Sequence, residues 1–300
     1  MSANEFLQTF FSGVALGGAY AIVALGFVIV FSATGILNLA QGGFVIFGAY
    51  LTYQFGSDWG LPFGLAVIAA MVVCGLLAVS LELTIMRKLT MKQEFAAVMV
   101  TAGVLFCSEA LSVTIWGVDP LNLGDPWGLD TVDILGASVA LSDIWTLIVS
   151  GALLAATFAF LNFTRGGLAM RACVVDREAA VAQGINPRRV SAAAWAVAGA
   201  AGGVAGAMLA TGTAGVNQTL ALASFAALPA MILGGLDSPA GAIVGGLIIG
   251  LIQQFTALLQ PEYLEFLGSR FAALTPYIVL TIILLVRPRG LFGTRQVQRF

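Results

Sequence analysis

Nine long apolar runs, separated by short polar gaps, dominate the amino-acid sequence. Each run approaches or exceeds the roughly 20 residues that a helix needs to cross a bilayer. The runs do not alternate between polar and apolar positions, as the strands of a membrane β-barrel do. They cover approximately residues 6–33, 38–55, 62–86, 94–116, 143–163, 191–213, 219–236, 240–258 and 271–286. The pattern predicts an all-α integral membrane protein with one transmembrane domain over residues 1–300, a polytopic helical bundle of about 8–9 transmembrane helices.

The second run opens with polar and flexible residues that are unusual in a membrane helix. Its first residues are Asn38, Leu39, Ala40, Gln41, Gly42, Gly43 and Phe44. Polar groups at membrane depth must be satisfied inside the protein, and each glycine weakens a helix by about 1 kcal/mol relative to alanine. Two interpretations stay open: a broken or re-entrant helix beside a cavity, or a helix that starts at the membrane surface with Asn38 as its cap. The first predicts a substrate path past Asn38, Gln41, Gly42, Gly43 and Phe44.

Glu109 is an acidic residue late in the 94–116 run. A charge at the bilayer centre costs about 2.5–3.5 kcal/mol, so acids inside spans are candidates for function. Near the outer interface the same carboxylate would be hydrated or paired, and the sequence leaves both positions open. We include Glu109 among the candidate residues of the substrate path.

The composition supports the membrane assignment and excludes several functions. Hydrophobic residues make up 59% of the 300 residues and charged residues 9%, and the mean hydropathy is +0.98. A soluble domain carries about 25% charged residues. Histidine is absent, the three cysteines are scattered, and no P-loop sequence is present. We therefore expect neither an enzyme nor a nucleic-acid-binding protein, and no cofactor bound by this chain.

The distribution of lysine and arginine predicts how the chain is oriented. All but one of the 13 basic residues lie in three gaps, 87–92, 164–190 and 287–299. The 117–142 gap carries four aspartates and no basic residue. Cytoplasmic loops are enriched in basic residues, so the three basic gaps are expected in the cytoplasm and 117–142 in the periplasm. Nine crossings then place the C-terminus inside the cell and the N-terminus, which lacks nearby basic residues, outside.

The cytoplasmic gap 164–190 looks structured. Between Gly167 and Gly184 its alanine-rich sequence predicts one short helix, which Gly184 ends. Two interpretations are open: a helix that docks a partner protein, or a solvated amphipathic connector. The first assigns candidate coupling roles to Arg171, Asp176, Arg177, Glu178 and Gly184.

Four stretches, in order along nearly the whole chain, make it resemble the branched-chain amino acid ABC transporter permeases, specifically the first of their two related subunits. The opening stretch is GVALGGAYAIVALGFVIVFSATGILNLAQGGFVIFGAYL, residues 13–51. The loop GLAMRACVVDREAAVAQGINPRRV, residues 167–190, resembles the ATPase-coupling loop of the family. The stretch MILGGLDSPAGAIVGGLIIGLI, residues 231–252, and the tail RPRGLFG, residues 287–293, complete the resemblance.

The resemblance implies an importer subunit in the bacterial inner membrane that works by alternating access. Its implied partners are a second homologous permease, two cytoplasmic ATPases that bind ATP and magnesium, and a periplasmic substrate-binding protein. One position departs from the family, in which the second glycine of the Gln-Gly-Gly segment is commonly acidic; here it is Gly43. That departure leaves open branched-chain or related amino acids, amides, urea, and small carboxylic or aromatic acids as substrates.

A stand-alone secondary transporter or channel for a small polar solute is the alternative from another class. It explains the hydropathy and the topology equally well. It leaves the 164–190 gap without a role, and it predicts charge pairs inside the membrane that the sequence does not suggest. An ATPase found beside this chain in its complex would decide between the two.

Overall fold

The computed structural model describes residues 3–89, 94–134, 136–212, 214–263, 268, 271–287 and 290–293. Within these residues, six helices are long and apolar enough to cross a membrane. They are α1 (Ala3–Thr34), α3 (Phe63–Thr84), α4 (Glu94–Trp116), α5 (Leu141–Phe163), α8 (Pro187–Leu209) and α10 (Pro239–Tyr263). Three shorter helices are α2 (Gln41–Tyr53), α9 (Leu220–Gly234) and α11 (Phe271–Val286). These nine coincide with the nine apolar runs, which confirms the predicted helical membrane fold.

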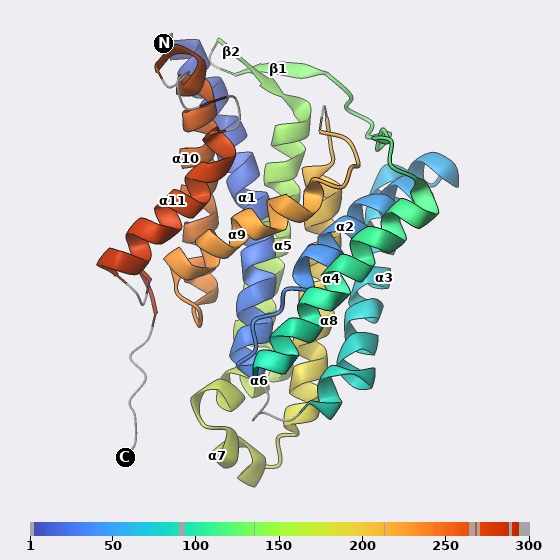
Figure 1. Cartoon of the computed structure of the whole chain (residues 1–300), viewed down its shortest axis with the longest axis vertical. Coiled ribbons are helices and arrows are strands. Elements are labelled where there is room, and N and C mark those ends of the chain that lie inside the picture. The colour runs from blue at the N-terminus through green and yellow to red at the C-terminus, as the bar shows by residue number, and fades with distance from the viewer. Residues whose placement is uncertain are drawn as a thin grey trace.

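Short elements complete the chain at the two ends of the bundle (Figure 1). A π-helical turn, Gln54–Asp58, continues α2, and a 3-10 turn, Met86–Lys88, follows α3. Strands β1 (Thr131–Ile134) and β2 (Ala137–Ala140) pair antiparallel at the upper end of Figure 1, and the sequence had not predicted this hairpin. Helices α6 (Arg165–Val175) and α7 (Arg177–Ala182) lie at the lower end.

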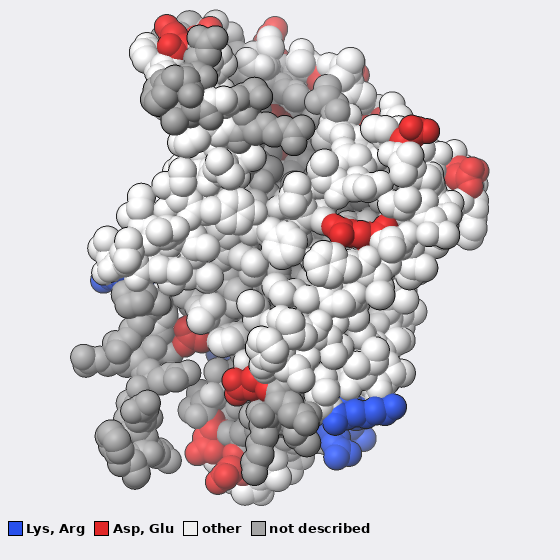
Figure 2. Space-filling view, viewed as in Figure 1, with Lys and Arg blue, Asp and Glu red and all other residues white. Residues whose placement is uncertain are grey.

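Basic side chains are unevenly distributed along the bundle. On the face shown in Figure 2, lysine and arginine lie in the half that carries α6 and α7, while aspartate and glutamate lie at both ends. The 117–142 and 164–190 segments lie at opposite ends, as one crossing of α5 between them requires. Which end faces the cytoplasm stays a prediction from the charge pattern.

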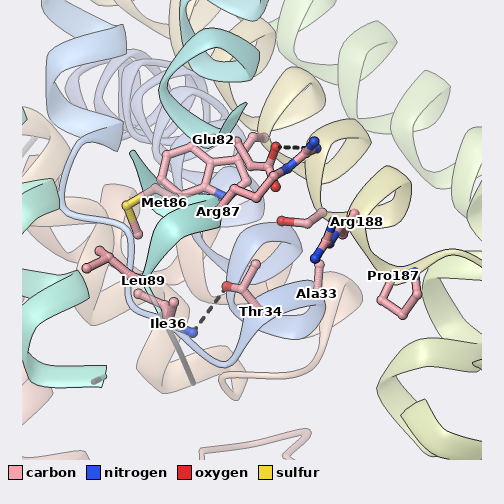
Figure 3. Close-up of a pocket in the computed structure, with 11 residues that line it drawn as sticks. Ala33, Thr34, Ile36, Glu82, Met86, Arg87, Leu89, Pro187 and Arg188 are labelled. Atoms are coloured by element: carbon pink, nitrogen blue, oxygen red, sulfur yellow. Dashed lines mark hydrogen bonds and ion pairs between the residues drawn. The ribbon is translucent and has the colours of Figure 1, made fainter. Parts of the chain in front are cut away.

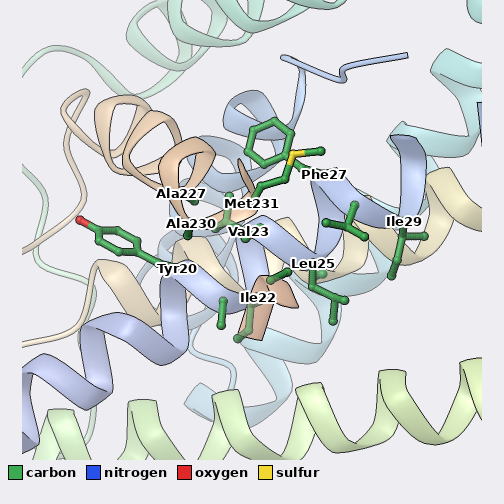
Figure 4. Close-up of a cluster of buried hydrophobic side chains, with 14 of the residues drawn as sticks. Tyr20, Ile22, Val23, Leu25, Phe27, Ile29, Ala227, Ala230 and Met231 are labelled. Carbon is green, nitrogen blue, oxygen red and sulfur yellow. The ribbon is translucent and has the colours of Figure 1, made fainter. Parts of the chain in front are cut away.

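Helix α1 is the central element of the bundle. Its most apolar window is 83% buried inside the protein, against 22% for α4 and for α5, so α1 is surrounded by protein while α4 and α5 lie at the periphery. Figure 4 shows the cluster around it, in which Phe27 of α1 approaches Met231 of α9. A helix that is apolar all round is expected in such a central position.

Glycines bring the backbones of α1 and α10 into direct contact. A Cβ atom added at Gly246 would lie 2.5 Å from the backbone nitrogen of Ala21, and one added at Gly250 would fall on the backbone of Gly17. Helices in a bilayer associate through such close packing because lipid offers no hydrophobic driving force between them. These glycines therefore set the distance between α1 and α10.

We expect Gly246→Val to prevent correct packing of α1 against α10. The new side chain would meet backbone atoms, which cannot rotate away, so the expected loss of stability is about 3 kcal/mol, the upper end for an overpacked core. Thermal unfolding of the purified protein measures the loss. Gly151→Val on α5, where a Cβ meets nothing within 4 Å, is the matched control. Equal stability of the two variants would contradict this account of the packing.

Candidate substrate path and coupling segment

The chain is not helical between α1 and α2, and this break runs from exposed Gly35 to buried Asn38 and Ala40. Gly35, with φ of +74°, ends α1, and its backbone N–H donates to Phe31 O at 2.7 Å. Asn38 and Gln41 are both fully buried. The Asn38 side-chain oxygen accepts a hydrogen bond from the Ala40 N–H at 3.1 Å, which forms a local turn just before α2. The structure therefore shows a helix break at which Asn38 and Gln41 are buried, and the two interpretations of how deep this break lies in the membrane stay predictions.

Neighbouring helices satisfy part of the free backbone at the break. The Leu39 N–H donates to the Thr101 hydroxyl of α4 at 3.1 Å. The Gln41 side-chain amide donates to the carbonyl of Ala198 on α8 at 3.0 Å. Irregular backbone at membrane depth needs partners of this kind. The start of α2 is therefore held between α4 and α8.

Two polar atoms at the break are buried without a hydrogen-bond partner among the described residues: Asn38 Nδ2 and Gln41 Oε1. Each such atom costs about 1–3 kcal/mol, and native proteins rarely leave one without a reason. One is a donor and the other an acceptor, and they belong to the first and fourth residues of one short segment. The pair therefore offers one hydrogen-bond donor and one acceptor that no described residue uses.

Gly42 and Gly43 close the seam between α2 and its neighbours. A Cβ atom at Gly42 would lie 2.5 Å from the Ser224 hydroxyl of α9 and 2.9 Å from Leu105 Cδ1 of α4. A Cβ atom at Gly43 would lie 2.6 Å from the Ser108 hydroxyl of α4. Side chains of α4 and α9 thus fill the space that larger residues at these two positions would need. An acidic side chain at position 43 would have to displace the Ser108 hydroxyl.

Phe44 and Glu109 do not join this seam in the same way. Phe44 is 4% exposed and faces α8, because a Cβ added at Gly202 would lie 2.8 Å from Phe44 Cβ. Glu109 is partly buried on α4 and forms no hydrogen bond or ion pair with a described residue. Its neighbours Phe106 and Leu111 are exposed at the edge of the bundle. Glu109 therefore lies beside the seam and not among the polar side chains of Asn38 and Gln41.

The predicted coupling segment, residues 164–190, forms two helices, where the sequence predicted one helix between Gly167 and Gly184. The chain is extended at Asp176, which separates α6 from α7. The Asp176 carboxylate accepts from the Ala179 N–H at 3.0 Å and so caps α7. Aspartate is a strong N-cap residue, and this local bond competes with a continuous helix.

The remaining predicted coupling residues lie around α6 and α7. Arg171 of α6 donates to the side chain and the backbone carbonyl of Asn162, at the end of α5. Gly184, with φ of +82°, ends α7 in a conformation that favours glycine. Glu178 is exposed, while the side chain of Arg177 lies outside the described residues. The segment presents a charged surface tied to the end of α5.

A cavity of about 150 Å³ near the ends of α1 and α3 was missed by the sequence analysis (Figure 3). Glu82 and Arg87, which both line it, form an ion pair at 3.1 Å, with Glu82 only 3% exposed. Trp195 Nε1 is buried there without a partner among the described residues. The cavity lies between Ile36 at the helix break and Arg188 at the start of α8. The signals in the sequence were a lone tryptophan in the Ala/Gly-rich 191–213 run and the close spacing of Glu82 and Arg87.

Comparisons with known proteins agree with this architecture. A family model described as "Branched-chain amino acid transport system / permease component" matches residues 9–286. The high-affinity branched-chain amino acid transport system permease protein LivH of Escherichia coli (strain K12) is 28% identical, over 98% of this chain and 97% of its own length. The permease protein LivM of that organism is 24% identical, over 93% of this chain and 69% of its own length. The structure "PsaBC from Streptococcus pneumoniae in complex with Fab" is 17% identical with a TM-score of 0.52, over 95% of this chain and 92% of that one, and shows a similar fold.

Proposed function

The chain belongs to the family of branched-chain amino acid transport system permease components, and we propose that it imports branched-chain or related amino acids through the seam where α2 starts. It is a multi-pass membrane transport subunit rather than an enzyme, and ATP hydrolysis belongs to separate subunits. The observation that carries the proposed path is the pair of buried, unpartnered atoms Asn38 Nδ2 and Gln41 Oε1. An amide donor and acceptor at that depth suit the carboxylate and ammonium groups of an amino acid.

The proposed transport cycle opens and closes the contacts of α2 with α4 and α9. In the described structure Ser224 and Ser108 block the space beside Gly42 and Gly43, so the seam is closed. Separation of the helices would expose the two unpartnered polar atoms to substrate. ATP binding on the partner subunits would then shift the population between closed and open seams.

A structural connection between the coupling segment and α9 supports this mechanism. The backbone N–H groups of Leu291 and Phe292 donate to the carbonyls of Leu233 and Gly234 at the end of α9, at 2.7 and 3.0 Å. Phe292 and Met170 of α6 line one cavity together with the turn between α9 and α10. Displacement of α6 would therefore act on the end of α9, whose Ser224 contacts the seam.

The proposed partners and orientation follow from the family and the charge pattern. The partners are a second homologous permease, two cytoplasmic ATPases that bind ATP and magnesium, and a periplasmic substrate-binding protein. The end carrying α6 and α7 is placed in the cytoplasm, and the hairpin end with the N-terminus in the periplasm of a bacterial inner membrane. Because position 43 is glycine where the family commonly has an acidic residue, urea, amides and small carboxylic or aromatic acids stay alternative substrates.

Uptake into proteoliposomes that hold the complete complex tests this proposal. With ATP on the ATPase side and binding protein on the other, radiolabelled leucine is expected to accumulate on the ATPase side. Urea and an aromatic acid serve as competing substrates. Uptake that needs no ATPase would favour a stand-alone secondary transporter, and transport only toward the binding-protein side would overturn the importer assignment.

A further inference from the structure

A second polar cavity, of about 370 Å³, lies at the hairpin end of the bundle and plays no part in the proposed path. It opens between the start of α1, the start of α5, the end of α8 and α10. Its side chains with polar atoms are Ser12, Ser142, Asp143, Thr146, Thr211 and Gln254. Apart from the Gln254 amide nitrogen, every polar side-chain atom in this set is an oxygen, and none of the described residues that line the cavity is basic.

Asp143 is the only charged side chain among the described residues that line the cavity. The Ser12 hydroxyl donates to Asp143 Oδ2 at 2.5 Å, and no other hydrogen bond or ion pair reaches this carboxylate from the described residues. A carboxylate that is partly withdrawn from water is costly unless a positive group compensates it. The position of Asp143 in the first turn of α5 supplies only a partial positive charge from the helix.

Thr146 provides an independent indication of a ligand. It lies one turn after Asp143 on the same face of α5 and is only 6% exposed. Its hydroxyl forms no hydrogen bond with a described residue, although it lines the cavity. Threonine hydroxyls inside helices usually bond to the backbone one turn back, as Thr157 of α5 does with Leu153 O at 2.8 Å. Thr146 therefore leaves an oxygen available to the cavity beside the carboxylate.

We propose that this cavity binds a small monovalent cation, held by Asp143 and by the oxygen atoms of Thr146, Ser142, Thr211 and Gln254. Hard oxygen ligands and a single carboxylate suit a sodium-sized ion or a primary ammonium group. Calcium sites use several carboxylates, and no cluster of three or more acidic, histidine or cysteine side chains occurs in the described part of the chain. The site does not depend on which solute the permease transports.

Thermal unfolding of the purified full-length protein in lipid nanodiscs tests the site at constant ionic strength. The probes are sodium, potassium, methylammonium and choline chlorides; choline carries the charge but has no N–H donor. At least one of the first three is expected to raise the melting temperature saturably above choline. A rise in melting temperature with sodium or potassium but not methylammonium indicates an inorganic ion. A rise with methylammonium only indicates an ammonium ligand. Equal melting temperatures in all four salts would overturn the proposal.

Variants identify the binding residues. Asp143→Asn is expected to lower the affinity for the cation by at least about tenfold, the usual effect of losing a charged hydrogen-bonding partner. Calorimetric titration measures this affinity. Thr146→Val keeps the shape and serves as a second variant if Asp143→Asn does not fold. Asp133→Asn, at an exposed carboxylate of β1 bonded to Ser138, is the matched control and should bind as the unaltered protein does. Unchanged affinity in both Asp143→Asn and Thr146→Val would refute the site.

Discussion

Gly42→Leu is expected to reduce uptake by more than tenfold while the chain still inserts and assembles with its partners. The leucine Cβ would start 2.5 Å from the Ser224 hydroxyl and 2.9 Å from Leu105 Cδ1. Both atoms belong to side chains, which can rotate, so the fold can adjust at a cost of about 1–3 kcal/mol. A branched side chain at that position would nevertheless prevent α2, α4 and α9 from alternating between the closed and the open arrangement. Uptake and co-purification of partner subunits are measured together.

A smaller change separates a blocked path from a general packing defect. Gly42→Ala should lower uptake less than Gly42→Leu, and removal of the opposing hydroxyl in Gly42→Ala/Ser224→Ala should restore most of it. Gly103→Leu on α4, where a Cβ meets nothing within 4 Å, is the control and should transport normally. Normal uptake by Gly42→Leu would remove this seam from the substrate path.

The nine membrane segments could be predicted from the sequence because hydropathy is a local property. The break before α2 was recognisable from Asn38, Gln41 and the paired glycines, but the burial of its side chains within the protein was not. That burial depends on Thr101 and Ala198, which are distant in the chain and hold Leu39 and Gln41 by hydrogen bonds. A surface start and a buried start have the same local sequence, so only tertiary contacts distinguish them.

Short-range competition explains the errors at the ends of the bundle. Alanine-rich sequence predicted one continuous helix over 167–184, whereas the Asp176 side chain ends α6 and caps α7. Glu82 and Arg87 are five residues apart and form an ion pair, and Glu82 is buried at a cavity that Trp195 of α8 also lines. Helix propensity and charge spacing cannot report which neighbouring helix covers a residue.

The largest effect expected outside the seam comes from neutralising the charges between α6 and α7. The variant Asp176→Asn/Arg177→Gln/Glu178→Gln should lose ATPase co-purification and reduce uptake by more than tenfold, while membrane insertion stays intact. Its physical reason is the loss of charged contacts between the coupling segment and the ATPase, which steer and fix docking. Asparagine is used at position 176 because its side-chain oxygen can still cap α7, as the Asp176 carboxylate does toward the Ala179 N–H.

Comparison with Asp176→Ala distinguishes docking from helix stability. Alanine removes both the charge and the cap, which costs about 1 kcal/mol of helix stability, whereas asparagine removes the charge alone. If only Asp176→Ala and not the neutralised triple variant loses transport, the segment is a structural connector that depends on its cap. If both lose transport and Asp119→Asn, an exposed acid at the opposite end, does not, the charges themselves dock the ATPase. Normal uptake and co-purification by the triple variant would exclude a docking role for these three residues.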